Sequence, residues 1–260
     1  MKSKITRVPM KLIFRVFELS LRLRRAFSLM LTQFGWFFGT LKFFNRGLLR
    51  LTEPHLFPSF SQFGEDRLLS HFLGVTKGLY VEVGCNDPVR YSNTWTLYEK
   101  GWHGLVIDAN PICISNFRRF RPNDIAVCSV VSDSSSEVDF YFCNESLISG
   151  VGAKSDGPWQ RSAQNSKVEK HRTARLDRLI SKHLGNGQAI DLLCVDVEGH
   201  EVEVLRSLDL AEISPHVILV EMHNFDLKGQ KNSPVYLHLT QNGYDLKAFD
   251  GVNGYFVRRK

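Results

Sequence analysis

Residues 79–87 read LYVEVGCND and residues 104–108 read GLVID, and the interpretation of the whole chain starts from these two segments. Each is a short apolar run that ends in polar residues, which is typical of a buried strand in a parallel sheet. Helical patterns follow both runs, one stopped at Gly101 and one with Pro111 near its start. Alternation of strand and helix predicts an α/β fold built on a mostly parallel sheet.

The same alternation continues to the end of the chain. Further strands are expected at residues 125–131, 137–142, 191–197 and 217–222, with an antiparallel pair at 246–249 and 255–258. Further helices are expected at residues 176–184, 199–208 and 234–242. Residues 144–173 are polar and rich in Gly and Ser with no clear period, which predicts a long loop and a candidate substrate lid.

Charge is divided unevenly along the chain. The 260 residues carry a formal net charge of +6 and are 43% hydrophobic, an ordinary composition for a folded protein. Residues 1–50 hold 11 Lys and Arg against one acid, so the remainder holds 22 against 26 and is slightly acidic. The basic character therefore belongs to an N-terminal segment, and no nucleic-acid partner is expected. We expect a basic amphipathic helical segment at residues 1–52 and one domain at residues 53–260.

The N-terminal segment has the spacing of an amphipathic helix. Between residues 10 and 31, basic and apolar positions recur at steps of three or four. An uncharged stretch at residues 26–41 has 16 residues, fewer than the roughly 20 that a membrane-spanning helix needs. We expect a helix lying on an anionic membrane surface through residues 10–50, with a helical extension packed on protein as the alternative. A membrane span and a secretory signal peptide are disfavoured.

Two groups of residues are interpreted as structural rather than catalytic. The five cysteines are odd in number and include no C-x-x-C pair, which favours a reducing, cytosolic compartment over a zinc site or a disulfide framework. Cys85 and Cys194 are expected to be small buried hydrophobic residues. Arg118, Arg119 and Arg121 are expected to form a solvated helix end that interacts favourably with the helix dipole.

Residues at the ends of the first two strands indicate the chemistry, because ligands of an open α/β sheet bind outside the carboxyl ends of its strands. Glu82 and Gly84 lie at the end of the first strand. Asp108 ends the second, 24 residues after the glycine, where a carboxylate commonly receives ribose hydroxyls. The NAD fingerprint needs Gly at the positions of Asn86 and Val89, so a dinucleotide is disfavoured. A carboxylate two residues before the glycine instead suits the ammonium group of a nucleoside–amino-acid ligand.

Five sequence blocks make this interpretation specific. They are SQFGEDRLL at 61–69, VEVGCNDP at 81–88, SNT at 92–94, GWHGLVIDANP at 101–111 and LLCVDVEGHE at 192–201. Together they resemble the FkbM family of S-adenosylmethionine-dependent methyltransferases over about residues 59–258, with weaker support from VNGYFV at 252–257. The resemblance implies the class I methyltransferase fold, a Rossmann-like α/β fold with a seven-stranded, mostly parallel sheet, helices on both faces and a last strand inserted antiparallel. It also implies S-adenosylmethionine as the cofactor.

The resemblance assigns residues to each part of the cofactor. They are Glu82, Gly84 and Asn86 for the methionine end, Asp108 for the ribose, Asn110 and Pro111 for the adjacent wall, and Ser132 and Asp133 for the adenine. Gln62 and Asp66 would close the pocket from the helix before the first strand. Pro88 stands where many cofactor-binding glycine loops have a small residue, so phosphate binding in this loop is doubtful, and S-adenosylmethionine has no phosphate.

The later strands supply the residues expected near the transferred methyl group. The resemblance implies that Asp196 is a catalytic and cofactor-binding residue beside the methyl group. It also implies that Glu198, which leads into the next helix, binds the cofactor. Transfer to a hydroxyl needs a positioned oxygen and removal of its proton, so His223, which titrates near neutral pH in its free state, is the candidate base. A wall histidine without a catalytic role is the alternative. Asp196, Glu221 and His223 could also hold a divalent metal, which is not expected.

We therefore expect an S-adenosylmethionine-dependent O-methyltransferase that acts on a hydroxyl of a sugar, a glycan or a lipid-linked natural product. The family resemblance is the ground for expecting oxygen as the acceptor atom. The N-terminal segment is the sole ground for expecting a lipid-linked substrate. The expected location is the cytoplasm, peripheral on the cytosolic face of the membrane. The alternatives are a catalytically degenerate scaffold at the membrane and a dinucleotide-dependent oxidoreductase. Glu82, Gly84, Asp108, Asp196 and Glu198 argue against the scaffold.

Overall fold

The computed structural model describes residues 59–74, 76–134, 136–142, 150–151, 167–229 and 233–259. The basic N-terminal segment, its predicted helix and the predicted domain boundary after residue 52 lie outside the described residues. Among the residues that are described, no helix is both long and apolar enough to cross a membrane.

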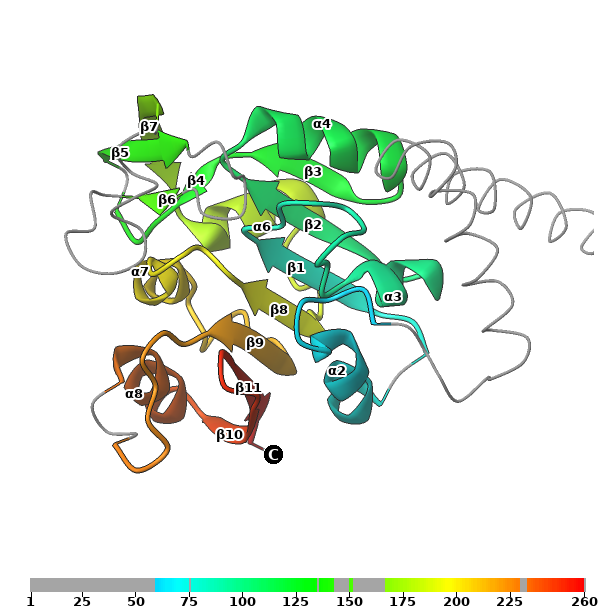
Figure 1. The fold of residues 1–260 in the computed structure, drawn as a ribbon, viewed down its shortest axis with the longest axis vertical. Coiled ribbons are helices and arrows are strands. Elements are labelled where there is room, and N and C mark those ends of the chain that lie inside the picture. Colours follow the sequence, from blue (N-terminus) through cyan, green and yellow to red (C-terminus); the bar gives the residue numbers. More distant parts are fainter. Residues whose placement is uncertain are drawn as a thin grey trace, which may run out of the picture. The chain divides into compact units, whose positions relative to one another are not determined.

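A seven-stranded sheet forms the centre of the domain (Figure 1). In spatial order its strands are β3 (Ile125–Cys128), β2 (His103–Asp108), β1 (Leu79–Val83), β8 (Leu192–Val195), β9 (Val217–Glu221), β11 (Asn253–Arg258) and β10 (Tyr244–Phe249). The first five pair in parallel, and β11 pairs antiparallel with both neighbours. The predicted mostly parallel sheet with an inserted antiparallel last strand is confirmed.

Helices cover both faces of this sheet (Figure 1). One face packs against α2 (Glu65–Leu73), α3 (Trp95–Glu99) and α4 (Pro111–Phe120). The other packs against α6 (Leu176–Leu184), α7 (Glu201–Arg206) and α8 (Pro234–Gln241). The predicted starts at two prolines are correct, because Asn110 and Ser233 cap α4 and α8 with a proline directly after each cap.

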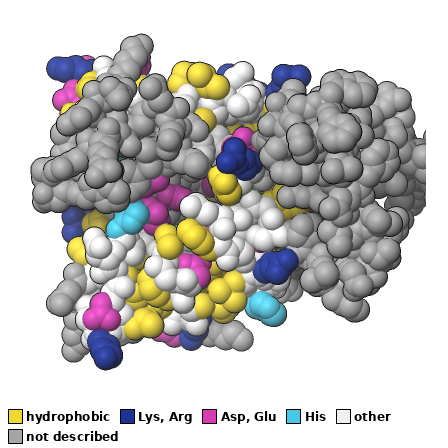
Figure 2. Space-filling view, in the orientation of Figure 1, with side chains coloured by type: hydrophobic (Ala, Val, Ile, Leu, Met, Phe, Trp, Pro, Cys, Tyr) yellow, Lys and Arg dark blue, Asp and Glu magenta, His cyan; other side chains and the backbone are white. Residues whose placement is uncertain are grey.

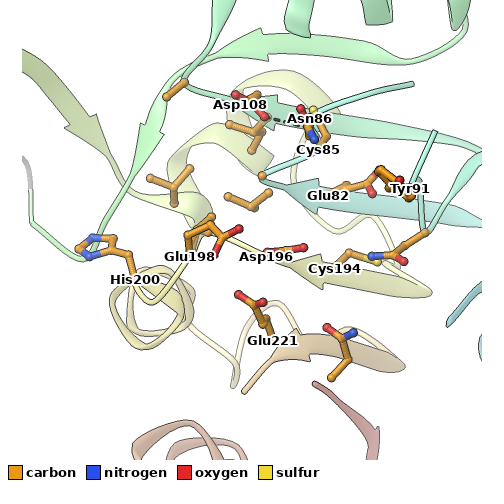
Figure 3. A pocket seen from close by; sticks show the side chains of 18 of the residues that line it. Glu82, Cys85, Asn86, Tyr91, Asp108, Cys194, Asp196, Glu198, His200 and Glu221 are labelled. Atoms are coloured by element: carbon orange, nitrogen blue, oxygen red, sulfur yellow. Dashed lines mark hydrogen bonds between the residues drawn. The ribbon is translucent and has the colours of Figure 1, made fainter. Parts of the chain in front are cut away.

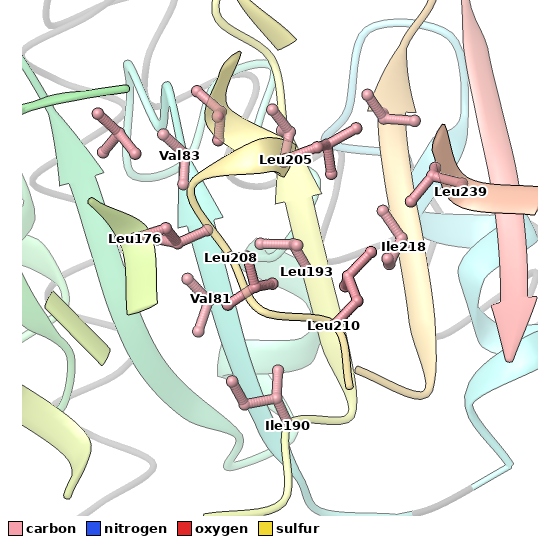
Figure 4. Packing of buried hydrophobic residues seen from close by; sticks show 14 of the residues in the cluster. Val81, Val83, Leu176, Ile190, Leu193, Leu205, Leu208, Leu210, Ile218 and Leu239 are labelled. Atoms are coloured by element: carbon pink, nitrogen blue, oxygen red, sulfur yellow. The ribbon is translucent and has the colours of Figure 1, made fainter. Parts of the chain in front are cut away.

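The alternation of side chains along each strand explains why the strands are apolar throughout. Val81 and Val83 of β1 belong to the core on the α6–α8 side, while Tyr80 belongs to the core on the α2–α4 side. Figure 4 shows the first of these cores, in which Leu193 and Ile218 from neighbouring strands continue the layer begun by Val81. Both faces are buried, so hydrophobic residues are favoured at every position.

A second, four-stranded sheet corrects two predictions. It consists, in spatial order, of β4 (Val130–Val131), β7 (Lys167–Ala174), β5 (Glu137–Phe142) and β6 (Gly150–Val151). The strand predicted at 125–131 is divided at Ser129, and its second part joins this sheet. The predicted loop at 144–173 is wrong at residues 150–151, which form β6, and at 167–173, where β7 pairs with the whole of β5. The rest of that loop, with the candidate substrate lid, lies outside the described residues. The sequence of β7 is charged and does not look like a strand. Its one packed face contacts Phe140 and Phe142 through His171, and its other face is exposed.

The turn after β1 brings two strand ends into direct contact. Gly84 has a φ of 81°, and a Cβ atom on it would lie 1.6 Å from the carbonyl oxygen of Asp196, which follows β8. The amide of Asp196 donates to the carbonyl oxygen of Val83, at 3.0 Å. Only glycine permits both the left-handed backbone and this approach.

We predict that Gly84→Ala prevents stable folding, while Gly187→Ala is tolerated. Gly187 has a similar φ of 77° but open space around it, so its substitution costs only the left-handed strain of about 1–2 kcal/mol. Thermal unfolding monitored by circular dichroism measures both. Equal melting temperatures for the two variants would show that the Gly84–Asp196 contact is not tight.

Candidate functional site

A cavity of about 460 Å³ opens at the carboxyl ends of β1, β2, β8 and β9. Its polar lining residues include Gln62, Glu82, Asn86, Asn93, Asp108, Asp196, Glu198, Glu221, His223 and Asn253. In the space-filling view, acidic side chains gather beside a histidine on this face (Figure 2). Figure 3 shows that the acids form two groups, one from β1 and β2 and the other from the ends of β8 and β9.

Asp108 organises the β1–β2 side of the cavity. Its two carboxylate oxygens accept hydrogen bonds from the backbone amides of Asn86, at 2.9 Å, and Asn110, at 2.7 Å. Asn110 in turn caps α4 by accepting from the amide of Ile112. Burial raises the pKa of Asp108, and the two amide donors oppose that rise. The carboxylate therefore fixes the turn after β1 relative to the start of α4.

Glu82 is the second acid on this side, and it is almost completely buried. Its Oε2 atom accepts a hydrogen bond of 2.6 Å from the Thr94 hydroxyl. Burial raises its pKa to about 7, against the opposing effects of the nearby Arg121 guanidinium and of the Thr94 hydrogen bond. Glu82 therefore changes its charge near neutral pH, at a position that lines the cavity.

The other predicted cofactor residues are only partly brought together. Gln62 lines the cavity, but Asp66 does not. The Asp66 carboxylate accepts hydrogen bonds within its own segment and from α3, from the hydroxyls of Ser59, Ser61 and Thr96 and the amide of Phe60. Ser132 and Asp133 are not in the described cavity wall, where Ser129, Val130 and Val131 stand instead. The Ser132 hydroxyl lies 3.0 Å from His200, which does line the cavity.

The β8–β9 side holds a compact group of acids around one histidine. The Nε2 atom of His223 lies 2.9 Å from Glu221 and 3.6 Å from Glu198. Glu198 reaches this position from a left-handed backbone with a φ of 58°. Asp196 hydrogen-bonds to Glu221, and burial together with the charge of Glu221 raises the pKa of Asp196 well above its usual value. Asp196 therefore retains a proton more readily than an exposed carboxyl group.

His223 carries a positive charge at neutral pH. Its hydrogen bonds with Glu198 and Glu221 raise its pKa to about 10. The prediction of His223 as the base uses the pKa of a free imidazole, whereas the two carboxylates favour the protonated form of His223 here. The imidazolium instead neutralises the two carboxylates that it contacts.

The group of ligand atoms suited to a metal differs from the predicted one. Atoms of Glu198, Glu221 and His223 lie within 4.8 Å of one another, a spacing that a cation could bridge. The prediction named Asp196 in place of Glu198. The side chain of Asp196 is engaged with Glu221 by a hydrogen bond instead.

Several lining residues were missed by the sequence interpretation. Glu65 and Asn253 both line the cavity, and Asn253 donates to Glu65 at 3.0 Å, which links the start of α2 to β11. Phe63 and Tyr91 also line it and remain exposed. The family sequence blocks include three of these residues, Phe63, Glu65 and Asn253. The blocks therefore indicated that these positions matter, but they did not indicate which residues they contact.

Strand order and site together define a class I methyltransferase. The antiparallel β11 between β9 and β10, the glycine turn after β1 and the acid after β2 occupy the positions that this class requires. The family model of the methyltransferase FkbM domain matches residues 82–246. The chain belongs to this family, as its sequence blocks predicted.

Comparison with solved structures found similar folds at low sequence identity. A TehB-like SAM-dependent methyltransferase from Corynebacterium glutamicum is 11% identical with a TM-score of 0.40, covering 85% of this chain and 96% of that one. A ribosomal protein L11 methylase from Lactobacillus delbrueckii subsp. bulgaricus is 8% identical with a TM-score of 0.40, covering 76% and 78%. WbdD is 15% identical with a TM-score of 0.36, covering 75% and 33%. A search of the curated proteins found no match.

Membership of this methyltransferase family implies S-adenosylmethionine as the cofactor, and the residues of the β1–β2 side fit it. The buried Oδ1 atom of Asn93 accepts no hydrogen bond from any residue that the structure describes, and Asn93 and Glu82 line the same cavity. A buried acceptor of this kind needs a donor, which an ammonium group would supply. Asp108 offers carboxylate oxygens to ribose hydroxyls. A cavity of about 460 Å³ is within the size range of cofactor sites.

We predict that Asp108→Asn weakens binding of S-adenosylmethionine about tenfold, the loss expected for a hydrogen bond to a charged group. The amide side chain presents an NH₂ group where one backbone amide now donates, so the turn after β1 is displaced as well. Isothermal titration calorimetry measures the affinity. Asp139→Asn on β5, which does not line the described cavity, is the matched control. Unchanged affinity in Asp108→Asn would contradict the assignment.

Proposed function

We propose that this chain transfers a methyl group from S-adenosylmethionine to a hydroxyl oxygen of a sugar, a glycan or a lipid-linked natural product. The observation that carries the proposal is the charged group of Glu198, Glu221 and His223, which borders the same cavity as Glu82 and Asp108. The cavity thus has one side suited to the cofactor. Its other side has carboxylates that can hydrogen-bond to an acceptor hydroxyl.

The β8–β9 side supplies what an oxygen acceptor needs. When bound, S-adenosylmethionine supplies an electrophilic methyl group on a sulfonium sulfur. Glu198 and Glu221 orient the acceptor hydroxyl by accepting its hydrogen bond, and one of them takes its proton as the oxygen is alkylated. The His223 imidazolium holds both carboxylates in place and limits their mutual repulsion.

Two exposed aromatic rings support a sugar as the acceptor. Phe63 and Tyr91 line the cavity, with exposed fractions of 56% and 40%. Aromatic faces pack against apolar surfaces, and the C–H face of a sugar ring offers one beside its hydroxyls. The acidic group and the aromatic rings together suit a polyhydroxylated molecule with an apolar face.

The basic N-terminal segment supports a location on the cytosolic face of the membrane. Its 11 Lys and Arg residues would attract anionic lipid headgroups, so a lipid-linked acceptor would be within reach.

A catalytically degenerate scaffold remains the second candidate. The charged group beside the cofactor side of the cavity favours turnover instead, because a buried carboxylate such as Glu221 is costly and a scaffold has no need of one there. The dinucleotide oxidoreductase is disfavoured by Asn86 and Val89.

The proposal is tested by incubating the protein with S-adenosylmethionine labelled in its methyl group and with fractionated cell-surface glycans and glycolipids. We expect label in an alkali-stable methyl ether of a carbohydrate. Glu198→Gln should retain binding of S-adenosylmethionine and lose at least about tenfold in rate. Cofactor binding without transfer to any fraction would favour the scaffold, and label in amine or carboxyl positions would refute the oxygen acceptor.

The pH dependence distinguishes the roles of His223. With saturating cofactor we expect kcat to be level above neutral pH and to fall near pH 10, because His223 loses there the proton that neutralises the carboxylates. A neutral His223 acting as the base would give the opposite result, a kcat that rises through pH 10.

Chelation tests the metal alternative at the same group. His223 already supplies a positive charge to Glu198 and Glu221, so we expect EDTA to change kcat less than about twofold. Loss of activity in EDTA and its recovery with Mg²⁺ or Mn²⁺ would assign Glu198, Glu221 and His223 as a cation site instead.

A further inference from the structure

Arg121 is completely buried, contrary to the expectation of a solvated helix end. It is the C-cap residue of α4, and its side chain reaches Tyr80 of β1 and Pro88 in the loop after that strand. Its guanidinium donates five hydrogen bonds, to Asp124 at 2.7 Å, Tyr80 at 2.6 Å, Thr94 at 2.8 Å, Ser92 at 3.2 Å and the carbonyl oxygen of Pro88 at 3.3 Å. Arginine is therefore required by its planar fork of donors, and not only by its charge.

The contact between Arg121 and Thr94 fixes the direction of a hydrogen-bond chain. Arginine has no acceptor, so the Thr94 hydroxyl accepts from Arg121 and must donate its own proton elsewhere. That proton goes to Glu82 Oε2, at 2.6 Å. The other carboxylate oxygen of Glu82 accepts no hydrogen bond from the residues that the structure describes. Arg121 thus sets both the orientation of Glu82 and the oxygen that is left for a ligand.

The same guanidinium anchors the loop between β1 and α3. It holds Pro88 and Ser92, while Tyr91 and Asn93 of this loop line the cavity. Ser92 also accepts from the amide of Trp95 at the start of α3. Arg121 does not line the cavity, but it positions the loop between β1 and α3, which forms part of the cavity wall on the β1–β2 side.

We propose that Arg121 is a positioning residue for the cofactor: through Thr94 it holds the Glu82 carboxylate toward the cofactor's ammonium group, together with Asn93. This inference rests on the proposed function. It adds a second layer of residues to the methionine end of the site, formed by Arg121, Thr94 and Ser92. None of these three is among the residues that line the described cavity.

The charges around Glu82 give this layer a measurable effect. Arg121 and the Thr94 hydrogen bond favour its ionised form, while burial and the acids Asp108 and Asp124 oppose it. Cys85 beside it and Cys194 on β8 are buried thiols that remain protonated, because burial raises their pKa. Removing the Thr94 hydroxyl therefore raises the pKa of Glu82 above about 7. A ligand that needs the carboxylate is then lost at a higher pH than in the unaltered protein.

The test is Thr94→Val in the full-length protein, which removes the hydroxyl and keeps the shape of the side chain. Binding of S-adenosylhomocysteine is measured by calorimetry between pH 6 and pH 9. We expect affinity at neutral pH to fall about tenfold and the acidic limb of the binding curve to move to higher pH. With saturating cofactor, kcat should stay within about threefold, because the acceptor side is untouched.

Thr240→Val, which removes a hydroxyl hydrogen bond to the carbonyl oxygen of Tyr236 within α8, is the matched control and should change neither quantity. Arg121→Lys keeps the charge without the fork and should bind more weakly than the unaltered protein, with a shifted acidic limb.

Each outcome bears on one claim. Unaltered affinity and an unshifted acidic limb in Thr94→Val would overturn the role of Arg121 while leaving the methyltransferase assignment intact. An equal loss in the Thr240→Val control would show a general effect of destabilisation and would also overturn it. If the unaltered protein failed to bind S-adenosylhomocysteine, the proposed function itself would fail.

Discussion

The contact between Gly84 and the carbonyl oxygen of Asp196 is the constraint on which the rest of the site depends. It joins the carboxyl ends of β1 and β8 so closely that no Cβ atom fits between them. Along the chain, Glu82 and Asn86 flank Gly84, and Glu198 follows Asp196. The side chains of Glu82, Asn86 and Glu198 all line the same cavity (Figure 3). The β1–β2 side and the β8–β9 side of the cavity meet at this contact. A cofactor bound to the β1–β2 side therefore lies beside an acceptor bound to the β8–β9 side. Proximity of this kind supplies much of the rate enhancement of a transfer reaction.

The two sides of the cavity handle negative charge in different ways. On the β1–β2 side, Glu82 is supported from behind by the buried Arg121, and Asp108 is held by backbone amides. On the β8–β9 side, the exposed His223 provides the positive charge directly at the cavity. A buried carboxylate without such support would be protonated. The arrangement therefore keeps acidic groups available at both ends of a methyl-transfer reaction.

Much of the fold was predictable, because the hydrophobic runs and the family blocks constrain it strongly. Strand and helix positions in the sheet follow from apolar runs buried on both faces, and the antiparallel β11 follows from the family resemblance. Arg121 was misassigned, since three arginines near a helix end look alike in sequence and only the fold shows that the last one turns inward. The β7 strand was missed because its residues are charged on the open face. The group of possible metal ligands beside His223 contains Glu198, where the sequence predicted Asp196. Glu198 reaches this position through a left-handed backbone conformation, which residue spacing does not predict.

We propose that one cavity positions the cofactor between Glu82 and the acidic group at the ends of β8 and β9. A crystal structure with S-adenosylhomocysteine tests it most directly. We expect the amino group of the ligand to lie against Glu82 and Asn93, the ribose on Asp108, and the sulfur directed toward Asp196 and Glu198. A ligand bound with its ribose at Glu82 and its amino acid end at Asp108, or bound outside this cavity, would contradict it.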